Sequence, residues 1–137
     1  MPALESPDSV AFSDRVLLTN SHRVGLTCVK ILKSKNIKTE HIFDLDQRQQ
    51  SIRKRAFWMG DARVKGCTIH SFKGWETRAL VIYVESAKSI RDRILVYVGL
   101  TRLRRHPQGS FLTVVCSAPE LESYGETWPS FERLQIS

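Results

Sequence analysis

The sequence predicts an α/β domain with a mostly parallel sheet of about five strands, because strand-type and helix-type patterns alternate along most of the chain. Short apolar runs rich in β-branched residues mark the strands, and longer segments with apolar residues at helical spacing lie between most of them. The 137 residues are enough for one domain with a single hydrophobic core. Periodicity alone supports this class and no narrower fold.

The elements are expected in the order strand, helix, strand, helix, strand, strand, helix, strand. Strands are expected at 15–20, 37–43, 64–69, 79–85 and 111–116, and helices at 24–35, 46–58 and from 89 towards 102. The first strand ends at Asn20, where a turn is favoured. The first helix has apolar residues at helical spacing, among them Val24, Cys28 and Ile31, and Gly60 is expected to stop the second helix.

The second half of the chain contains a polar turn between two strands and a helix after them. Ser71 in the turn is a candidate helix N-cap, and the following strand begins near Ala79. Ser89 and Asp92 resemble a capping box at the start of the last helix. That helix keeps apolar residues at helical spacing, namely Ile90, Ile94, Tyr97 and Val98. Pro107 and the glycine that follows two residues later break it before the apolar strand 111–116.

The expected domain covers 14–118, with a loose lead-in at 1–13 and a tail at 119–137. A net charge of +7 and a pI near 9.7 favour a polyanionic partner. No apolar run approaches the roughly 20 residues that a membrane helix needs. Cys28, Cys67 and Cys116 form no C-x-x-C pair and are typical of reduced core residues of an intracellular protein.

Two stretches carry the chemistry, and they occur in a fixed order with a strand between them. The first is Thr-Ile-His-Ser-Phe-Lys-Gly-Trp-Glu at 68–76, and the second is Tyr-Val-Gly-Leu-Thr-Arg at 97–102. They resemble motifs V and VI of superfamily 1 helicases of the UvrD/Rep type. The motif V segment (68–76) departs from the family pattern at Trp75, where leucine is usual, and Leu103 replaces the alanine that usually follows motif VI.

The resemblance implies a three-layer RecA-like domain that binds nucleotide together with a second such domain. Arg102, the last residue of the motif VI segment (97–102), would be an arginine finger that reaches the γ-phosphate of ATP. Glu76 would accept a hydrogen bond from the ribose, and Gly74 belongs to the same contact region. Residues 16–23 faintly resemble motif IV, in which Leu18 or Thr19 occupies the place of the usual arginine and Arg23 is a candidate substitute.

The same resemblance implies a track of single-stranded nucleic acid, most simply DNA. Thr68, His70 and Lys73 are the candidate contacts, through a hydroxyl, an imidazole and an ammonium group. The competing interpretations are structural: a satisfied histidine at a strand end for His70, and an ion pair for Lys73. For Arg102 the competing interpretation is a helix-end arginine paired with a carboxylate.

The chain contains no G-x-x-x-x-G-K-S/T sequence, which is the Walker A loop that cradles phosphates. ATP and Mg²⁺ would therefore be held mainly by an N-terminal Walker A-containing RecA-like domain outside this chain, and the isolated chain would be inactive. The family resemblance further implies a cytoplasmic protein of DNA repair, with no membrane partner.

Two other classes stay open at this stage. One is a non-catalytic module, derived from a helicase domain, that binds nucleic acid or protein; the weak motif IV and the missing Walker A loop favour it. The other is an independent small enzyme. The sequence shows no Ser-His-Asp set, no cysteine nucleophile and no metal-ligand cluster that would support the second.

Overall fold

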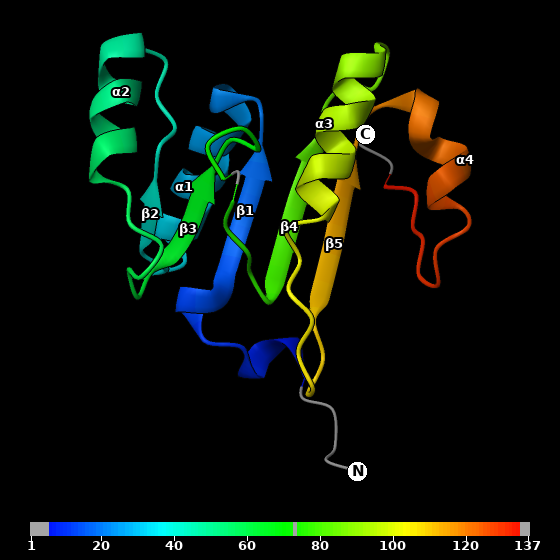
Figure 1. Ribbon diagram of the computed structural model, residues 1–137, viewed down its shortest axis with the longest axis horizontal. Coiled ribbons are helices and arrows are strands. Elements are labelled where there is room, and N and C mark those ends of the chain that lie inside the picture. Colours follow the sequence, from blue (N-terminus) through cyan, green and yellow to red (C-terminus); the bar gives the residue numbers. More distant parts are fainter. Residues whose placement is uncertain (1–5, 73, 135–137) are drawn as a thin grey trace.

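The computed structural model describes residues 6–72 and 74–134, and its centre is a five-stranded sheet (Figure 1). The strands run in the order β2-β3-β1-β4-β5, and all four pairings are parallel. They are β1 (Arg15–Thr19), β2 (Thr39–His41), β3 (Val64–Cys67), β4 (Ala79–Val84) and β5 (Phe111–Cys116). This confirms the predicted α/β class and its mostly parallel sheet of five strands.

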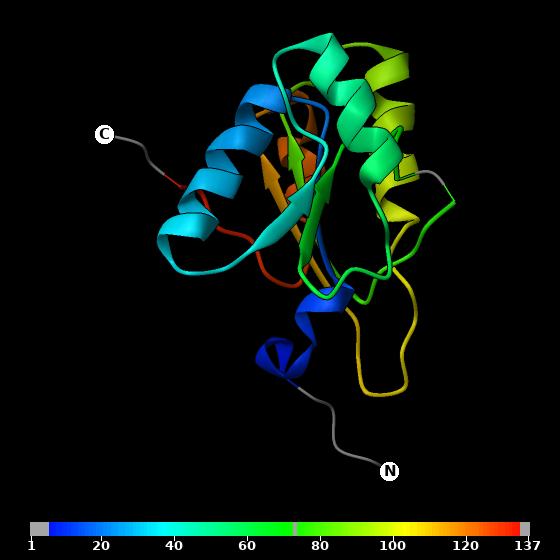
Figure 2. The same cartoon turned by 90° about the vertical axis from the view of Figure 1, so that its left-hand side faces the viewer.

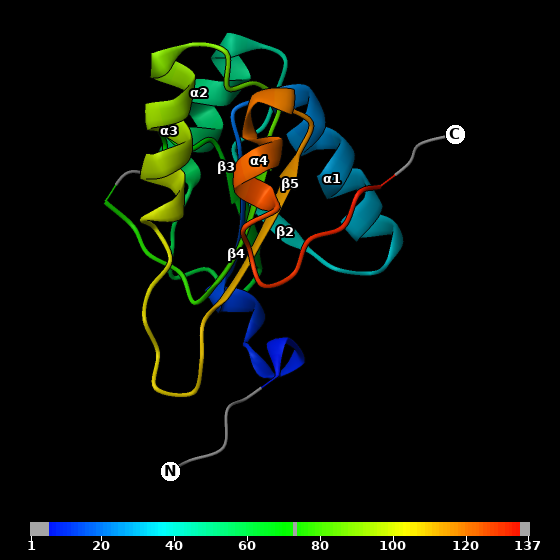
Figure 3. The same ribbon diagram turned by 90° about the vertical axis from the view of Figure 1, so that its right-hand side faces the viewer.

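Helices lie on both faces of this sheet. The α-helices are α1 (His22–Ser34), α2 (Gln47–Ala56), α3 (Ile90–Leu100) and the short α4 (Glu122–Gly125). Helix α1 lies on one face and helices α2 and α3 on the other (Figure 2), while α4 lies beside β5 (Figure 3). Right-handed crossovers explain why the helices lie on different faces, because the face depends on the direction in which the chain moves along the sheet. The chain moves outward from β1 to β2 through α1, and it then returns across the sheet in the opposite direction through α2 and α3. The three-layer arrangement is consistent with a RecA-like domain.

The hydrophobic core lies mainly between the sheet and the α2/α3 layer. Leu18, Ile82 and Phe72 are fully buried there. A second packing centre under α1 is the buried ring of Phe43, which occupies the space above Gly25; a Cβ atom there would lie 2.4 Å from the ring. This close approach requires glycine in an otherwise ordinary helix.

Several element boundaries differ from the sequence prediction. Strand β2 ends at His41, because the His41 Nδ1 atom accepts a hydrogen bond from the Phe43 amide and turns the chain, although both following residues are buried. Helix α2 ends at Ala56, before Gly60, because Phe57 is extended. Among the described residues between Ser71 and β4 there is no helix, so the prediction that Ser71 caps one is wrong.

Helix α3 is confirmed, but three of the four apolar residues that keep helical spacing along it do not face the core. Ile90, Ile94 and Tyr97 are 73%, 58% and 68% exposed. The fourth, Val98, packs against the core together with Leu95, Val96 and Leu100, and Gly99 is buried against the sheet. Ser89 caps the helix by accepting from the Asp92 amide at 3.1 Å, as the sequence predicted.

The cysteines are free thiols in unlike environments. Cys67 is buried, and burial raises its pKa to about 12. Cys28 is half-buried, whereas Cys116 is exposed and so is not the core residue that the sequence predicted. In the part of the chain that the structure describes, no helix is long and apolar enough to cross a lipid bilayer.

Candidate functional site

The motif V segment connects two parallel strands, so it must return from the carboxyl ends of the strands to their amino ends. These two ends of the sheet are called the carboxyl edge and the amino edge. The segment leaves the carboxyl end of β3 and leads to the amino end of β4, and β1 lies between these strands in the sheet (Figure 1). Its first residues therefore lie at the carboxyl edge, and its last residues lie near the amino edge. The sequence-predicted site residues consequently fall into two groups.

The carboxyl-edge group contains Thr68, His70 and Arg23. The Thr68 side chain is nearly buried; its hydroxyl donates to Ser71 Oγ at 2.9 Å and accepts from the Ser71 amide at 3.3 Å. These bonds fix the turn that follows β3. His70 is exposed, and Arg23 is exposed in the first turn of α1, which follows the carboxyl end of β1.

The middle of the motif V segment contains a turn that depends on glycine. Gly74 has a φ of +90°, which is unfavourable for residues with a side chain. A Cβ atom there would meet nothing within 4 Å, so the backbone conformation, not space, requires glycine. Trp75 is 46% exposed and so does not belong to the core, and Glu76 is exposed. Lys73, a predicted contact, lies outside the described residues.

A backbone junction joins the ends of the two motif segments. The Thr77 amide donates to the Arg102 carbonyl at 2.9 Å, and the Arg104 amide donates to the Thr77 carbonyl at 2.7 Å. These bonds form an isolated parallel bridge between Thr77 and Leu103. Glu76 and Arg102 each adjoin this bridge, so two of the four residues that the sequence assigned to the nucleotide lie on neighbouring backbone segments.

Arg102 is partly exposed at the end of α3. Its guanidinium group donates to the Thr101 hydroxyl, from Nη2 at 3.0 Å and from Nε at 3.4 Å. Among the described residues it has no carboxylate partner, unlike the ion-paired arginine of the competing interpretation. The guanidinium therefore keeps donors available for another acceptor.

Arg23 does not join this group. It lies at the carboxyl edge, whereas Arg102 lies near the amino end of β4, at the other edge of the sheet. The nucleotide contact predicted for Arg23 therefore has no geometric support, because the structure places it with Thr68 and His70.

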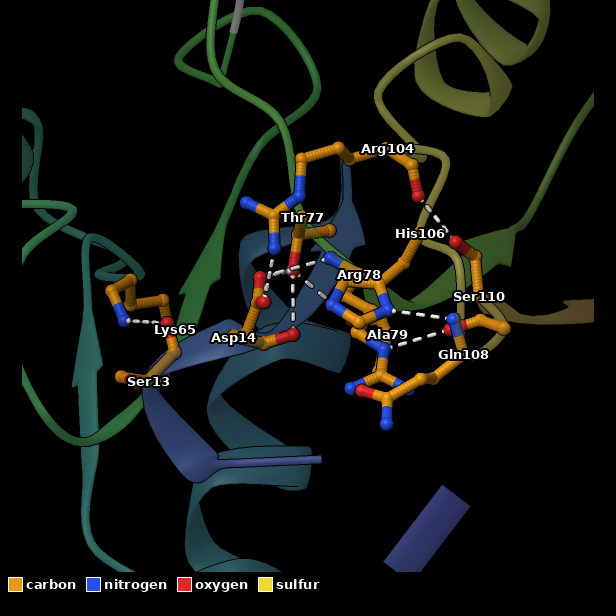
Figure 4. Close-up of polar contacts among 11 residues, drawn as sticks. Ser13, Asp14, Lys65, Thr77, Arg78, Ala79, Arg104, His106, Gln108 and Ser110 are labelled. Carbon is orange, nitrogen blue, oxygen red and sulfur yellow. Dashed lines mark hydrogen bonds and ion pairs between the residues drawn. The ribbon is translucent and has the colours of Figure 1, made fainter. Parts of the chain in front are cut away.

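Sequence reasoning did not identify the polar cluster around Asp14 at the amino edge (Figure 4). The Asp14 carboxylate accepts from the Arg78 amide at 2.9 Å and forms an ion pair with Arg104. Its carbonyl oxygen accepts from the Thr77 hydroxyl at 2.8 Å. These partners come from both sides of the Thr77–Leu103 bridge, and no local signal in the sequence indicates them.

Lys65, which is fully buried, lies beside this cluster on β3. Its ammonium group donates to the carbonyl oxygens of Ser13 at 2.7 Å, Asp61 at 2.7 Å and Arg63 at 3.1 Å. Burial lowers its pKa, while nearby carboxylates, chiefly that of Asp61, oppose the shift. The three carbonyls satisfy all three donors, so Lys65 ties the segment before β1 to the sheet.

The described residues contain no group of histidine, cysteine, aspartate and glutamate side chains that could hold a metal ion. A shallow cavity of about 190 Å³ opens at the carboxyl edge and is lined by polar side chains that include Asn20, Glu85 and Asp92. Its carboxylates make it a poor place for a phosphate. Arginine side chains, among them Arg102 and Arg104, therefore lie near the amino edge, and the described residues provide no metal site.

No protein-family model matches the chain, and no curated protein matches it. Among solved structures, the chain is similar to the C-terminal part of the Fun30 ATPase domain, with a TM-score of 0.48 and 11% sequence identity. The match covers 88% of this chain and 41% of that one, so the chain spans less than half of the solved structure.

Proposed function

We propose that this chain is the second motor domain of an ATP-dependent superfamily 1 helicase or translocase of the UvrD/Rep type. The observation that carries the proposal is the Thr77–Leu103 bridge, which places Glu76 and Arg102 on adjacent backbone segments, and the Arg102 guanidinium has no carboxylate partner among the described residues. Each residue also matches its motif by sequence. A chance resemblance would not require the two segments to meet in space.

In this proposal ATP lies between this chain and a partner domain that carries the Walker A loop. Mg²⁺ would neutralise phosphate charge and would be held mainly by the partner domain. Water attacks the γ-phosphorus, the bond to the ADP oxygen breaks, and charge builds on the transferred group. Arg102 donates to those oxygens, and the Glu76 carboxylate accepts from the ribose hydroxyls.

An exposed apolar strip beside Arg102 supports an interface on this side. Ile90, Ile94 and Tyr97 follow one another along the outer face of α3, and the helix ends two residues before the motif VI arginine. Exposed apolar side chains in a row are typical of protein interaction surfaces. In the proposal they face the Walker A-containing domain.

The track would be single-stranded DNA at the carboxyl edge. Exposed His70 is the candidate contact there, whereas the Thr68 hydroxyl is engaged within the turn and serves mainly to shape it. Lys73 stays a candidate contact from the sequence alone. The net charge of +7 supports a polyanionic partner. The isolated chain should bind single strands weakly, with affinity that falls steeply as salt rises. Binding that ignores salt, or no binding at low ionic strength, would contradict this part.

The nucleotide role is tested by ATPase turnover. The chain alone should show no hydrolysis above background, and with the Walker A-containing domain it should hydrolyse ATP in response to single strands. Arg102→Ala should then lower turnover by about 10³-fold or more, the scale of an arginine finger. Arg102→Lys should restore little, because an ammonium group lacks the planar fork of donors. Arg105→Ala, an exposed neighbour, is the matched control and should change turnover little.

Strand affinity should survive both Arg102 substitutions, because the residue lies away from the carboxyl edge. If Arg102→Ala leaves turnover within about threefold, or roughly 0.7 kcal/mol of barrier, the arginine-finger assignment is wrong. Salt-dependent strand binding without any ATPase in the two-domain assembly would instead favour the non-catalytic binding module.

A further inference from the structure

We propose that Asp14 is a positioning residue that fixes Arg102 and Glu76 relative to each other. The inference rests on the proposed function for the meaning of that geometry, although the structural contacts stand independently of it. Asp14 touches neither motif segment at its reacting residue. It binds the residues just beyond each of them.

The Asp14 carboxylate spans the bridge between the two motif segments. One oxygen, Oδ1, accepts from the Arg78 amide at 2.9 Å, and the other, Oδ2, pairs with the Arg104 guanidinium (Figure 4). Arg78 follows Glu76 by two residues, and Arg104 follows Arg102 by two residues. A single carboxylate therefore holds the chain on both sides of the point where the two segments meet.

The bridge needs such a support because it is isolated. Its two backbone hydrogen bonds join Thr77 to the carbonyl of Arg102 and to the amide of Arg104, and Thr77 and Leu103 lie outside the named strands. A pair this short fixes its register weakly, since no neighbouring ladder repeats the pattern. The Thr77 hydroxyl adds a third tie by donating to the Asp14 carbonyl at 2.8 Å.

Asp14 is itself held in place from the core. The adjacent Ser13 carbonyl accepts from the fully buried Lys65 ammonium group at 2.7 Å. On its other side, Arg15 donates from Nε to the Val10 carbonyl at 2.9 Å. The backbone around the carboxylate is thus held by contacts that do not involve the bridge, which is the requirement for a preorganised support.

The ion pair with Arg104 is unsuited to a purely stabilising role. The side chains of Arg104 and Asp14 are 42% and 25% exposed, and exposed pairs contribute little to stability. A role in geometry is different, because displacement of a catalytic group by about 1 Å can cost about 100-fold in rate. The ion pair of Asp14 with Arg104 therefore matters more for where Arg102 lies than for whether the chain folds.

The first test measures amide hydrogen exchange in the full chain without a partner. Asp14→Ala should speed exchange at the Thr77 and Arg104 amides by about tenfold or more, since local opening becomes easier. Asp14→Asn, which keeps an oxygen for the Arg78 amide but loses the charge, should have a smaller effect. The Ile82 amide in β4 should be unchanged in both. Asp8→Ala, at an exposed acid of the same lead-in segment, is the matched control.

The second test is a double-mutant cycle on ATP turnover in the two-domain assembly. Asp14→Ala should lower turnover roughly 10- to 100-fold in the wild-type background, through misplacement of Arg102. In the Arg102→Ala background it should change turnover by less than about twofold, because the group that it positions is gone. Nucleotide KM should change less than kcat.

The outcomes separate this inference from the proposed function. Unchanged exchange at both bridge amides would overturn the inference, and so would an equal loss of turnover in both Arg102 backgrounds, which would show a merely structural role. If Arg102→Ala itself left turnover unchanged, the proposed function would fail and the positioning role with it, whereas faster exchange in Asp14→Ala would still establish that Asp14 holds the bridge.

Discussion

Lys65→Met should markedly destabilise the chain, because it removes a buried cation while keeping the apolar stem. The ammonium group donates to three backbone carbonyls and its side chain is fully buried. Methionine has similar length and no donors, so the change isolates the polar contribution. All three carbonyls would lose their partner in one step.

The expected magnitude follows from these three acceptors. A buried acceptor left without a donor costs about 1–3 kcal/mol. Two of the carbonyls belong to Asp61 and Arg63, which precede β3 in a partly exposed turn, so water can replace some of the lost bonds. Relief from burying a charge offsets a further part. If each of the three carbonyls costs the lower limit of that range, about 1 kcal/mol, the free energy of unfolding falls by about 3 kcal/mol.

Urea denaturation followed by circular dichroism measures this loss. With a slope of about 2 kcal/mol per molar urea, the midpoint should fall by about 1.5 M. Lys30→Met, at an exposed position of α1, is the matched control and should change the free energy of unfolding by less than about 0.5 kcal/mol. A midpoint for Lys65→Met equal to or above that of the wild type would refute the reasoning.

Two further predictions concern the packing centre under α1. Gly25→Ala should lower the free energy of unfolding by about 1–3 kcal/mol in urea titration, because its Cβ would overlap the Phe43 ring, and Phe43→Leu in the same chain should recover part of the loss. Burial lowers the pKa of both His22 and His41, and nearby basic side chains lower it further. The Nδ1 atom of each histidine accepts a hydrogen bond from a backbone amide. Their neutral forms therefore contribute stability that is present above about pH 6.5 and is lost as pH falls through the lowered pKa values. Denaturation midpoints from pH 7.5 to 5 should show this decline, and His41→Asn, which keeps an acceptor, should make it shallower; an identical decline would contradict the assignment.

The order and type of the elements were predictable because local signals determine them. The strand Phe111–Cys116 is a continuous apolar run, and Ser89 is a strong helix N-cap, so both were found at their true positions. The buried face of α3 was not predictable by counting apolar residues, since Ile94 and Tyr97 also keep helical spacing but are exposed. Spacing identifies a helix, whereas the choice between two apolar faces depends on what packs against it.

The candidate site, like the fold, was predictable from the sequence only in part. The motif resemblance assigns Glu76 and Arg102 to one nucleotide, which stays a prediction, and it could not reveal that a backbone bridge joins the segments that carry them. Asp14 stayed hidden because its partners Arg78 and Arg104 are 64 and 90 residues away along the chain. Long-range polar contacts leave no periodic pattern in a sequence, so only the fold discloses them.

The two outermost strands of the sheet, β2 and β5, differ in a way that bears on solubility. Edge strand β2 has three residues and a charged side chain, Glu40, whereas edge strand β5 has six residues, nearly all apolar. A short charged edge resists pairing with other chains, and a long apolar edge invites it. Helix α4 lies beside β5 (Figure 3) and is held near it by buried Ala118 and half-buried Leu121. The segment that begins at Pro119 therefore lies next to this strand, and removing it should increase aggregation of the chain.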